Sequence, residues 1–397
     1  MFSSKDSVVI VSAKRSAIGS FCGSLSSLPA HEIGSEVIKD IIKKTAIDAS
    51  EIDEVILGQV LTAGQGQNPA RQAAIKAGLP VEKTALGINQ VCGAGLRAVA
   101  MGMQQLSMGD ANVIIAGGQE SMSLSHHASN MRNATKMGNT EFIDTMIKDG
   151  LWDAFHGYHM GVTAENVAKK FNISREEQDV FAVNSQNKAE KAKSFGNFIE
   201  EITPVSTIIK KSEIFVDEDE YIRDGATLAS LHKLNPAFSK NGTVTAGNAS
   251  GLNDGAAALL MASEDGLKNH GLTPMARMVS AAVAGVEPRI MGIGPVDAIP
   301  KAIKMAGLKQ SDINLFELNE AFAAQSLACL REWPELDTQK VNPLGGAIAI
   351  GHPLGCSGVR LLTTLTNQLE RTGGRYGLAA MCIGVGQGIA LIIENNL

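Results

Sequence analysis

Cys92-Gly93-Ala94-Gly95-Leu96-Arg97-Ala98-Val99 opens a predicted helix, and the apolar stretch Val113-Ile114-Ile115-Ala116-Gly117-Gly118 follows it. The same order returns in the second half of the chain. There His352-Pro353-Leu354-Gly355 opens a helix, and the apolar stretch 377–383 follows. In each copy a reactive residue stands in a glycine-rich turn before a helix and a buried strand. A weak repeat of this kind indicates two similar βα lobes that arose by duplication, with a site between them.

The sequence around these two stretches continues the alternation of strands and helices. Apolar residues recur at helical spacing in 31–44 and in 296–305. The short apolar runs 7–12, 55–61 and 315–319 are typical of buried strands. Alternating strands and helices predict an α/β protein whose parallel or mixed sheet is covered by helices.

A change of composition divides the chain. Between 121 and 250 the connections are longer and more polar, and the capping box Ser174-Arg175-Glu176-Glu177 predicts the start of a long helix. We therefore expect an inserted loop domain in the middle of the first lobe. The expected division is an N-terminal core lobe of residues 1–120 and 251–272, an inserted loop domain of residues 121–250, and a C-terminal core lobe of residues 273–397.

The composition excludes several classes of protein. With 44% hydrophobic and 19% charged residues in 397, the chain is typical of a globular protein. The net charge of −6 argues against nucleic-acid binding. No apolar run is long enough for a membrane span. The polar start and the ending Asn395-Asn396-Leu397 resemble neither a secretory signal nor a peroxisomal address, so a cytoplasmic location is expected.

The cysteines predict thiol chemistry. There are five of them without a C-x-x-C pair, which argues against both a disulfide framework and a zinc site, so no metal is expected. Cys92 precedes a helix, where the helix dipole lowers the pKa of a thiol. With His352 and Asn319 it forms a set suited to an acyl-enzyme, and Cys382 lies in a second glycine-rich turn. Structural roles are expected for the remaining cysteines, Cys22, Cys329 and Cys356.

Four segments, in this order, resemble the signature segments of the thiolases, closest to the short-chain acetyl-CoA acetyltransferases. They are Asn89-Gln90-Val91-Cys92-Gly93-Ala94-Gly95-Leu96, Asn319-Glu320-Ala321-Phe322, Gly351-His352-Pro353 and Cys382-Ile383-Gly384. The resemblance covers nearly the whole chain and implies a layered αβαβα core. It also implies a homotetramer, a dimer of dimers, that acts in fatty acid metabolism on acetyl-CoA, acetoacetyl-CoA and CoA without a cofactor.

The resemblance also implies a role for each catalytic residue. Cys92 would be acetylated by a first acetyl-CoA while His352 takes its proton. Cys382 would then remove a proton from a second acetyl-CoA, and the resulting enolate would be stabilised by His352 and a water held by Asn319. The backbone N–H groups of Cys92 and Gly384 would bind the oxyanion formed when the enolate carbon attacks the acetyl group.

The same resemblance implies which residues bind the substrate. His159 and Ser250 would contact the pantetheine arm of CoA, and Arg223 its nucleotide end. A small acyl pocket would be walled by Met160, Met291 and Phe322.

Two departures from the family pattern put the activity level and the acyl preference in question. Ala94 replaces a serine of the family, and Val385 replaces a glycine. A longer-chain degradative 3-ketoacyl-CoA thiolase is the nearest alternative, and a catalytically silent acyl-CoA-binding protein is the alternative from another class. We also hypothesise that mild oxidation joins Cys92 to Cys382 reversibly, since low-pKa thiols oxidise readily.

Overall fold

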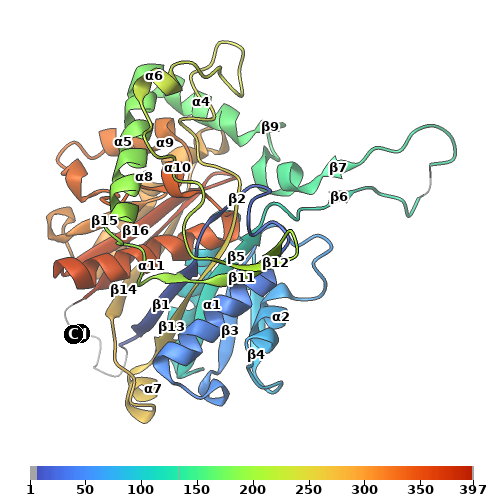
Figure 1. Cartoon of the computed structure of the whole chain (residues 1–397). Coiled ribbons are helices and arrows are strands. Elements are labelled where there is room, and N and C mark those ends of the chain that lie inside the picture. The colour runs from blue at the N-terminus through green and yellow to red at the C-terminus, as the bar shows by residue number, and fades with distance from the viewer. Residues whose placement is uncertain (1–6, 134, 396–397) are drawn as a thin grey trace.

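The computed structural model describes residues 7–133 and 135–395 (Figure 1). The termini from which a cytoplasmic location was expected, 1–6 and 396–397, lie outside the described residues. The main sheet has 11 strands and consists of two halves. The halves join where β1 (Val9–Ser16) pairs with β14 (Ala276–Gly285), at Val9 with Arg277 and at Ile10 with Ala276.

Four strands follow the same order in each half of the sheet, and the first half has one additional strand at its edge. The first half runs β4 (Thr84–Ile88), β3 (Glu54–Gly58), β5 (Val113–Ser121), β13 (Asn253–Ala262) and β1. The second half runs β15 (Leu315–Leu318), β16 (Tyr376–Ile383), β17 (Gln387–Glu394) and β14. In the first half, β5 pairs parallel with β3 and antiparallel with β13. In the second half, β16 likewise pairs parallel with β15 and antiparallel with β17. The repeat predicted from the sequence is therefore present in the topology.

Helices separate and cover the two half-sheets. α3 (Ala94–Met108) and α11 (Leu354–Thr372) pack against each other between the halves, while α1 (Ala30–Thr45) and α2 (Pro69–Lys76) cover the outer face of the first half and α8 (Gly294–Ala306) that of the second. The two central helices approach closely because Gly95 has no side chain: a Cβ there would lie 2.7 Å from the Gly355 carbonyl oxygen. The order helix, sheet, helix, sheet, helix is the layered αβαβα core that was expected.

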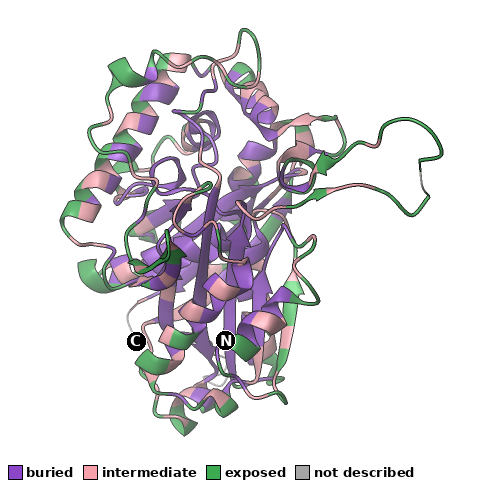
Figure 2. Cartoon of the chain, turned by 45° about the vertical axis from the view of Figure 1, so that its right-hand side comes forward, coloured by how far each residue is buried: buried purple, intermediate pink, exposed green. Residues whose placement is uncertain are grey.

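Three apolar clusters correspond to the three layers of helices. The largest lies around α3 and α11 and includes Leu96, Val99, Leu361 and Leu365. A second lies between the first half-sheet and α1, and a third between the second half-sheet and α8. Both faces of the central strands are therefore buried, as Figure 2 shows by their purple colour.

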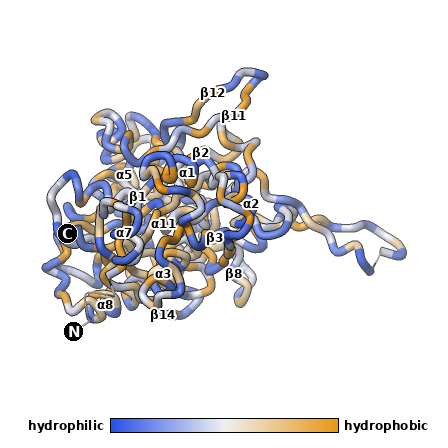
Figure 3. The backbone as a smooth tube through the Cα atoms, turned by 90° about the horizontal axis from the view of Figure 1, so that it is seen from below, coloured by the Kyte–Doolittle hydropathy of each residue, from blue (hydrophilic) through white to orange (hydrophobic). Residues whose placement is uncertain are grey.

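The segment between β5 and β13 lies at one end of the core and includes α4 (Met160–Lys170), α5 (Arg175–Ser194) and α6 (Leu228–Leu231). The remaining short elements in it are a π-helix, η3 (Met146–Leu151), and the strands β6 (His127–Ala128), β7 (Ile143–Asp144), β8 (Trp152–Asp153), β9 (Tyr158–His159), β10 (Ile202–Thr203), β11 (Val205–Ile209) and β12 (Ser212–Val216). An arm around β6 and β7 projects far from the body (Figures 1 and 3). The capping box at Ser174 is present, as predicted. The division into an inserted domain stays a prediction.

Further short elements belong to both lobes. α9 (Ala323–Arg331) and α10 (Ala347–Ile350) follow β15, α7 (Glu264–Asn269) follows β13, and β2 (Gly19–Ser20) pairs with β13. Among the described residues, no helix combines the length and the apolar character that crossing a membrane requires.

Candidate active site

A cavity of about 360 Å³ lies where elements of the two lobes meet the 121–250 segment. Cys92 reaches it from the turn before α3, His352 from the turn before α11, and Cys382 from the end of β16. The cavity thus brings together side chains that are up to 290 positions apart in the sequence. Nine of the eleven site residues expected from the sequence line it: Cys92, His159, Met160, Ser250, Met291, Phe322, His352, Cys382 and Gly384.

Cys92 follows a turn with a constrained backbone. Val91 has a φ of 48°, and its N–H donates a hydrogen bond to Asn89 Oδ1 at 2.8 Å. The Gly93 N–H donates to the Gln90 carbonyl at 3.1 Å and closes the turn. This arrangement places the sulfur at the start of the helix and resembles the strained turns that carry nucleophiles in other enzymes.

The prediction of a lowered pKa for Cys92 is wrong for this structure. Burial raises the pKa of the thiol to about 11. The backbone N–H groups of Gly384 and of Cys92 itself face the sulfur and favour the thiolate, but they offset only part of the cost of removing the charge from water. The sequence could not show this desolvation, because residues far apart in the chain cause it. Cys92 therefore rests as a thiol and needs a base.

Cys382 is also a thiol at rest. Its side chain is almost fully buried, and burial together with the neighbouring Cys92 raises its pKa well above the usual value. The premise of the oxidation hypothesis, two thiols of low pKa, is therefore not met. Cys329 and Cys356 are buried among core residues, whereas Cys22 is exposed.

His352 has the properties of a general base. Burial lowers the pKa of its imidazole to about 4, so the ring is neutral at pH 7. Its Nδ1 lies 2.6 Å from Ser357 Oγ, and that hydroxyl donates its single proton to the Pro353 carbonyl at 2.8 Å. The Ser357 oxygen must then accept from Nδ1–H. The proton on Nδ1 leaves Nε2 with the lone pair that takes up a proton.

The backbone of His352 is fixed by a neighbouring strand. Its N–H donates to Asn253 Oδ1 at 2.9 Å, and Asn253 Nδ2 donates to the Gly19 carbonyl at 3.0 Å. Gly351 allows this contact, because its φ is 113° and a Cβ there would lie 2.5 Å from the amide carbon of Asn253. Glycine is thus required immediately before His352.

Asn319 lies behind His352. It follows β15, its N–H donates to the Ala380 carbonyl at 2.9 Å, and its side chain is buried. Asn319 Nδ2 lies 3.4 Å from His352 Nε2. Its Oδ1 is buried and has no partner among the described residues. A buried amide with free hydrogen-bonding capacity beside the base is suited to holding a water molecule.

Glu320, next to Asn319, supports the site from behind. Its carboxylate accepts hydrogen bonds from Ser185 Oγ at 2.6 Å, from Asn342 Nδ2 at 2.8 Å and from the Ile348 N–H at 3.3 Å. These bonds tie α5 and the start of α10 to the end of β15. Glu320 therefore stabilises the path of the chain that leads to His352.

The wall of the cavity is apolar and aromatic. Met160, Met291 and Phe322 form one buried cluster with Cys382. Phe238 joins them, with its ring nearly perpendicular to that of Phe322 at a centroid distance of 6.3 Å. Such a wall favours an apolar acyl group over a polar one.

His159 combines a structural role with a place in the cavity wall. Its Nδ1 accepts the Gly161 N–H at 3.0 Å at the start of α4, and its ring stacks on Phe238 at 4.7 Å. Since Nδ1 accepts, Nε2 carries the proton of the neutral ring. Burial lowers the pKa of His159, so the ring is suited to donating a neutral hydrogen bond.

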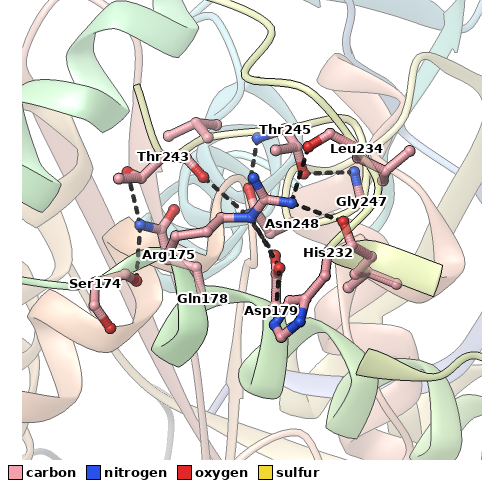
Figure 4. A network of polar contacts seen from close by, with 12 residues as sticks. Ser174, Arg175, Gln178, Asp179, His232, Leu234, Thr243, Thr245, Gly247 and Asn248 are labelled. Carbon is pink, nitrogen blue, oxygen red and sulfur yellow. Dashed lines mark hydrogen bonds and ion pairs between the residues drawn. The ribbon is translucent and has the colours of Figure 1, made fainter. Parts of the chain in front are cut away.

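The segment with Ser250 is held in place by a polar network (Figure 4). Asp179 on α5 accepts from Arg175 Nε at 2.8 Å and from Asn248 Nδ2 at 2.9 Å, and Asn248 Oδ1 accepts the Thr245 N–H at 2.8 Å. The Ser250 N–H in turn donates to the Ala321 carbonyl at 3.0 Å. This network joins the segment to the chain that follows Asn319, so Ser250 and Phe322 keep a fixed relation.

Arg223 lies outside the cavity wall. It is exposed, and its guanidinium carbon stands 5.3 Å from the ring centroid of Tyr221, which does line the cavity. Arg223 is therefore placed toward the solvent side of Tyr221. Tyr221 was not among the residues expected from the sequence, and its position two residues before Arg223 was the available signal.

Comparison with known proteins settles the family. Residues 8–265 match the family model of the thiolase N-terminal domain, and residues 272–395 match that of the thiolase C-terminal domain. The chain belongs to the thiolase family. It is an acyltransferase of that family, and the layered core described above is the thiolase fold.

Two curated relatives of this thiolase are 58% identical to it, and both are acetyl-CoA acetyltransferases. The protein of Rhizobium meliloti (strain 1021) matches over 98% of this chain and 99% of its own, and that of Paracoccus denitrificans over 97% and 98%.

Solved structures give the same fold. The acetyl-CoA acetyltransferase of Bacillus anthracis has a TM-score of 0.96 at 41% identity and covers 98% of this chain and 99% of its own. The human mitochondrial 3-ketoacyl-CoA thiolase in complex with CoA has a TM-score of 0.94 at 42% identity, with 98% of both chains covered.

The thiolase also has a larger groove, of about 810 Å³, between α5 and α9. It shares Glu320 and Ser185 with the support behind the site, but its described lining holds neither a cysteine nor a histidine. The smaller cavity contains the groups needed for acyl transfer, so the chemistry is assigned there.

Proposed function

We propose that this thiolase is an acetyl-CoA acetyltransferase that converts two acetyl-CoA into acetoacetyl-CoA and CoA, reversibly, through an acetyl group on Cys92. This proposal rests on one observation: two thiols, Cys92 and Cys382, line the same cavity as the neutral imidazole of His352. A single acyl transfer needs one nucleophile and one base. A second thiol is required only if a carbon–carbon bond is also made or broken.

The first half-reaction acetylates Cys92. Its sulfur attacks the thioester carbonyl of acetyl-CoA while His352 Nε2 takes the thiol proton, and the N–H groups of Cys92 and Gly384 donate hydrogen bonds to the oxyanion. The bond to CoA then breaks, and the Cys382 thiol donates its proton to the leaving sulfur. The products are acetyl-Cys92, free CoA, a protonated His352 and a Cys382 thiolate.

The second half-reaction makes the carbon–carbon bond. The Cys382 thiolate removes a proton from the methyl carbon of a second acetyl-CoA, and protonated His352 with a water held by Asn319 stabilises the enolate. The enolate carbon attacks acetyl-Cys92. The carbon–sulfur bond breaks, and Cys92 recovers its proton from His352. This cycle uses the two raised thiol pKa values: each cysteine rests as a thiol and becomes a thiolate only within the reaction.

Neither half-reaction changes an oxidation state, and the N–H groups named above stabilise the oxyanion by hydrogen bonding. The proposal therefore includes no metal and no redox cofactor. For the substrate, His159 and Ser250 are proposed to contact the pantetheine arm, and Arg223 beside Tyr221 the nucleotide end of CoA. A cytoplasmic location and a role in fatty acid metabolism stay predictions.

A longer-chain 3-ketoacyl-CoA thiolase is the second candidate, and one observation favours it. The cavity wall continues from Met146 along apolar Ile147 and Leu151, which extends the surface available to an acyl chain. Thiolysis rates with acetoacetyl-CoA and with 3-ketoacyl-CoA of longer chains distinguish the two. A higher kcat/KM for acetoacetyl-CoA supports the proposal, and a kcat/KM that rises with chain length supports the second candidate.

We propose a homotetramer, a dimer of dimers, as the functional assembly. Two features support it: the edge strand β4 is largely exposed, and the arm that projects from the body in Figure 3 includes apolar residues that are exposed. On the arm these are Met131, Met137, Phe142 and Ile143. Light scattering coupled to size-exclusion chromatography tests the proposal, and a mass corresponding to a monomer would contradict it.

A further inference from the structure

The two turns beside the nucleophile each hold a valine in a left-handed backbone conformation. The φ of Val91 is 48° and that of Val385 is 62°. This conformation is unfavourable for a β-branched residue and persists only where surrounding contacts fix it. Val91 directly precedes Cys92, and Val385 directly follows Gly384. Relaxation of either turn would therefore rotate an N–H group that faces the Cys92 sulfur.

The two turns make close apolar contacts because Gly93 and Gly384 have no side chains. A Cβ on Gly93 would lie 2.3 Å from Ile383 Cδ1, and a Cβ on Gly384 would lie 3.3 Å from Val91 Cγ1. The turns thus approach each other across the boundary between the lobes. Contacts of this kind are non-directional and allow one turn to slide along the other.

A polar contact that joins the same turns is directional. Gln90 Nε2 donates a hydrogen bond to Gln387 Oε1 at 2.9 Å, between residues 297 positions apart. The Gln90 carbonyl closes the turn that contains Cys92, by accepting the Gly93 N–H. Gln387 begins β17 and pairs with Ile383, so it closes the turn that contains Gly384. The hydrogen bond therefore connects the closing residue of one turn to that of the other.

We propose that the hydrogen bond between Gln90 and Gln387 is a brace across the lobes that holds the Gly384 N–H in place against Cys92, and that both glutamines are positioning residues for acyl transfer. They act through the turns and do not touch the substrate. The inference rests on the proposed function, which assigns the Gly384 N–H to the oxyanion. It adds a requirement that the two donors of the oxyanion hole, which come from different lobes, keep their spacing.

The test compares Gln90→Met, Gln387→Met and the double variant, because methionine has a similar length and forms no such hydrogen bond. Complete loss of an oxyanion donor lowers kcat about 10² to 10³-fold. For a displaced donor we expect each single variant to lower kcat for thiolysis of acetoacetyl-CoA about tenfold with KM unchanged. The double variant should lose no more than either single variant.

Gln105→Met is the matched control. Gln105 lies at the far end of α3, and its Nε2 donates to Glu54 Oε2 at 2.9 Å, so the substitution removes a comparable bond away from the cavity. The control should keep kcat. Gln387→Glu retains an acceptor for the Gln90 amide and should recover most of the lost kcat. This second variant also provides a folded form if the methionine variant is unstable.

A second readout separates positioning from a purely structural role. The Gly384 N–H favours the Cys92 thiolate, so displacing it should raise the pKa of Cys92, measured as the pH dependence of alkylation by iodoacetamide. The brace would be overturned if both methionine variants kept the wild-type kcat and the wild-type pKa of Cys92. It would also be overturned if the fold-loss of kcat in the double variant equalled the product of the two single losses. Failure of the wild-type enzyme to acetylate Cys92 would contradict the proposed function instead, and alkylation would still test the brace.

Discussion

His352 Nδ1 lies 2.6 Å from Ser357 Oγ, and the hydroxyl proton of Ser357 is already used in a bond to the Pro353 carbonyl. This relationship fixes the imidazole tautomer with its basic nitrogen, Nε2, available to the thiol.

Ser357→Ala should therefore lower kcat between about 10- and 100-fold, since a positioned base contributes about 10² to 10⁴-fold and the variant loses part of that. Burst kinetics with acetyl-CoA would show a slower acetylation phase. Thr366→Val is the control: it removes a hydroxyl bonded to the Leu362 carbonyl one turn back in the same helix, and should leave the phase unchanged. An unaffected burst in Ser357→Ala would show that the tautomer is set in another way.

Asn319→Ala separates the two half-reactions. Asn319 Nδ2 lies near His352 Nε2 and is assigned to the enolate, so its loss should lower acetoacetyl-CoA formation about 10² to 10³-fold. Acetylation of Cys92 should continue at close to the wild-type rate, since that step uses the other oxyanion donors. If acetylation and condensation fell together, the assignment of Asn319 to the enolate would be wrong.

The low pKa of His352 predicts a specific dependence of stability on pH. The unfolded chain binds a proton at this residue below its usual pKa of 6.5, whereas the folded protein does so only below about 4. The free energy of unfolding should therefore fall between pH 6.5 and pH 4, by about 3 kcal/mol from this group. Urea unfolding of the wild type and of His352→Gln tests this. In the variant the free energy of unfolding should fall by about 3 kcal/mol less over this pH range. If the free energy of unfolding depended on pH in the same way in both proteins, the result would count against a buried neutral imidazole.

At Val385 we expect the glycine variant to be more stable than the alanine variant, the reverse of the usual order. In an extended or helical backbone, glycine is less stable than alanine by roughly 0.5–1 kcal/mol. At a φ of 62° alanine is strained by about 1–2 kcal/mol, so Val385→Gly should be more stable than Val385→Ala. Val283 in β14 is the control, where the glycine variant should be the less stable one. Thermal unfolding measures both pairs, and the usual order at 385 would mean that this turn rearranges.

The elements that the sequence predicts well are those with a local cause. Ser174 caps α5, as the capping box in the sequence predicts. The strand predicted at 55–61 ends at Gly58, because Val60 and Leu61 donate their N–H groups to the Glu120 carboxylate instead of to a neighbouring strand. Such long-range bonds leave no signal in the local pattern.

The candidate site shows the same limit. The chemistry-bearing residues stand out because a cysteine or histidine in a glycine-rich turn is recognisable in sequence, and the motif order then points to the family. The charge states do not follow in this way. The helix dipole predicted a low pKa for Cys92, whereas burial against a cluster that includes Met122, Met146 and Leu354 raises it. Ser357 and the pair Gln90 and Gln387 act through contacts that only the folded chain creates.

The most direct test of the account is peptide mapping by mass spectrometry after the wild-type enzyme has been incubated with acetyl-CoA and quenched in acid. The account predicts an acetyl group on the peptide that contains Cys92, removed when CoA is added before the quench. An unmodified Cys92, or an acetyl group found on Cys382 instead, would contradict it.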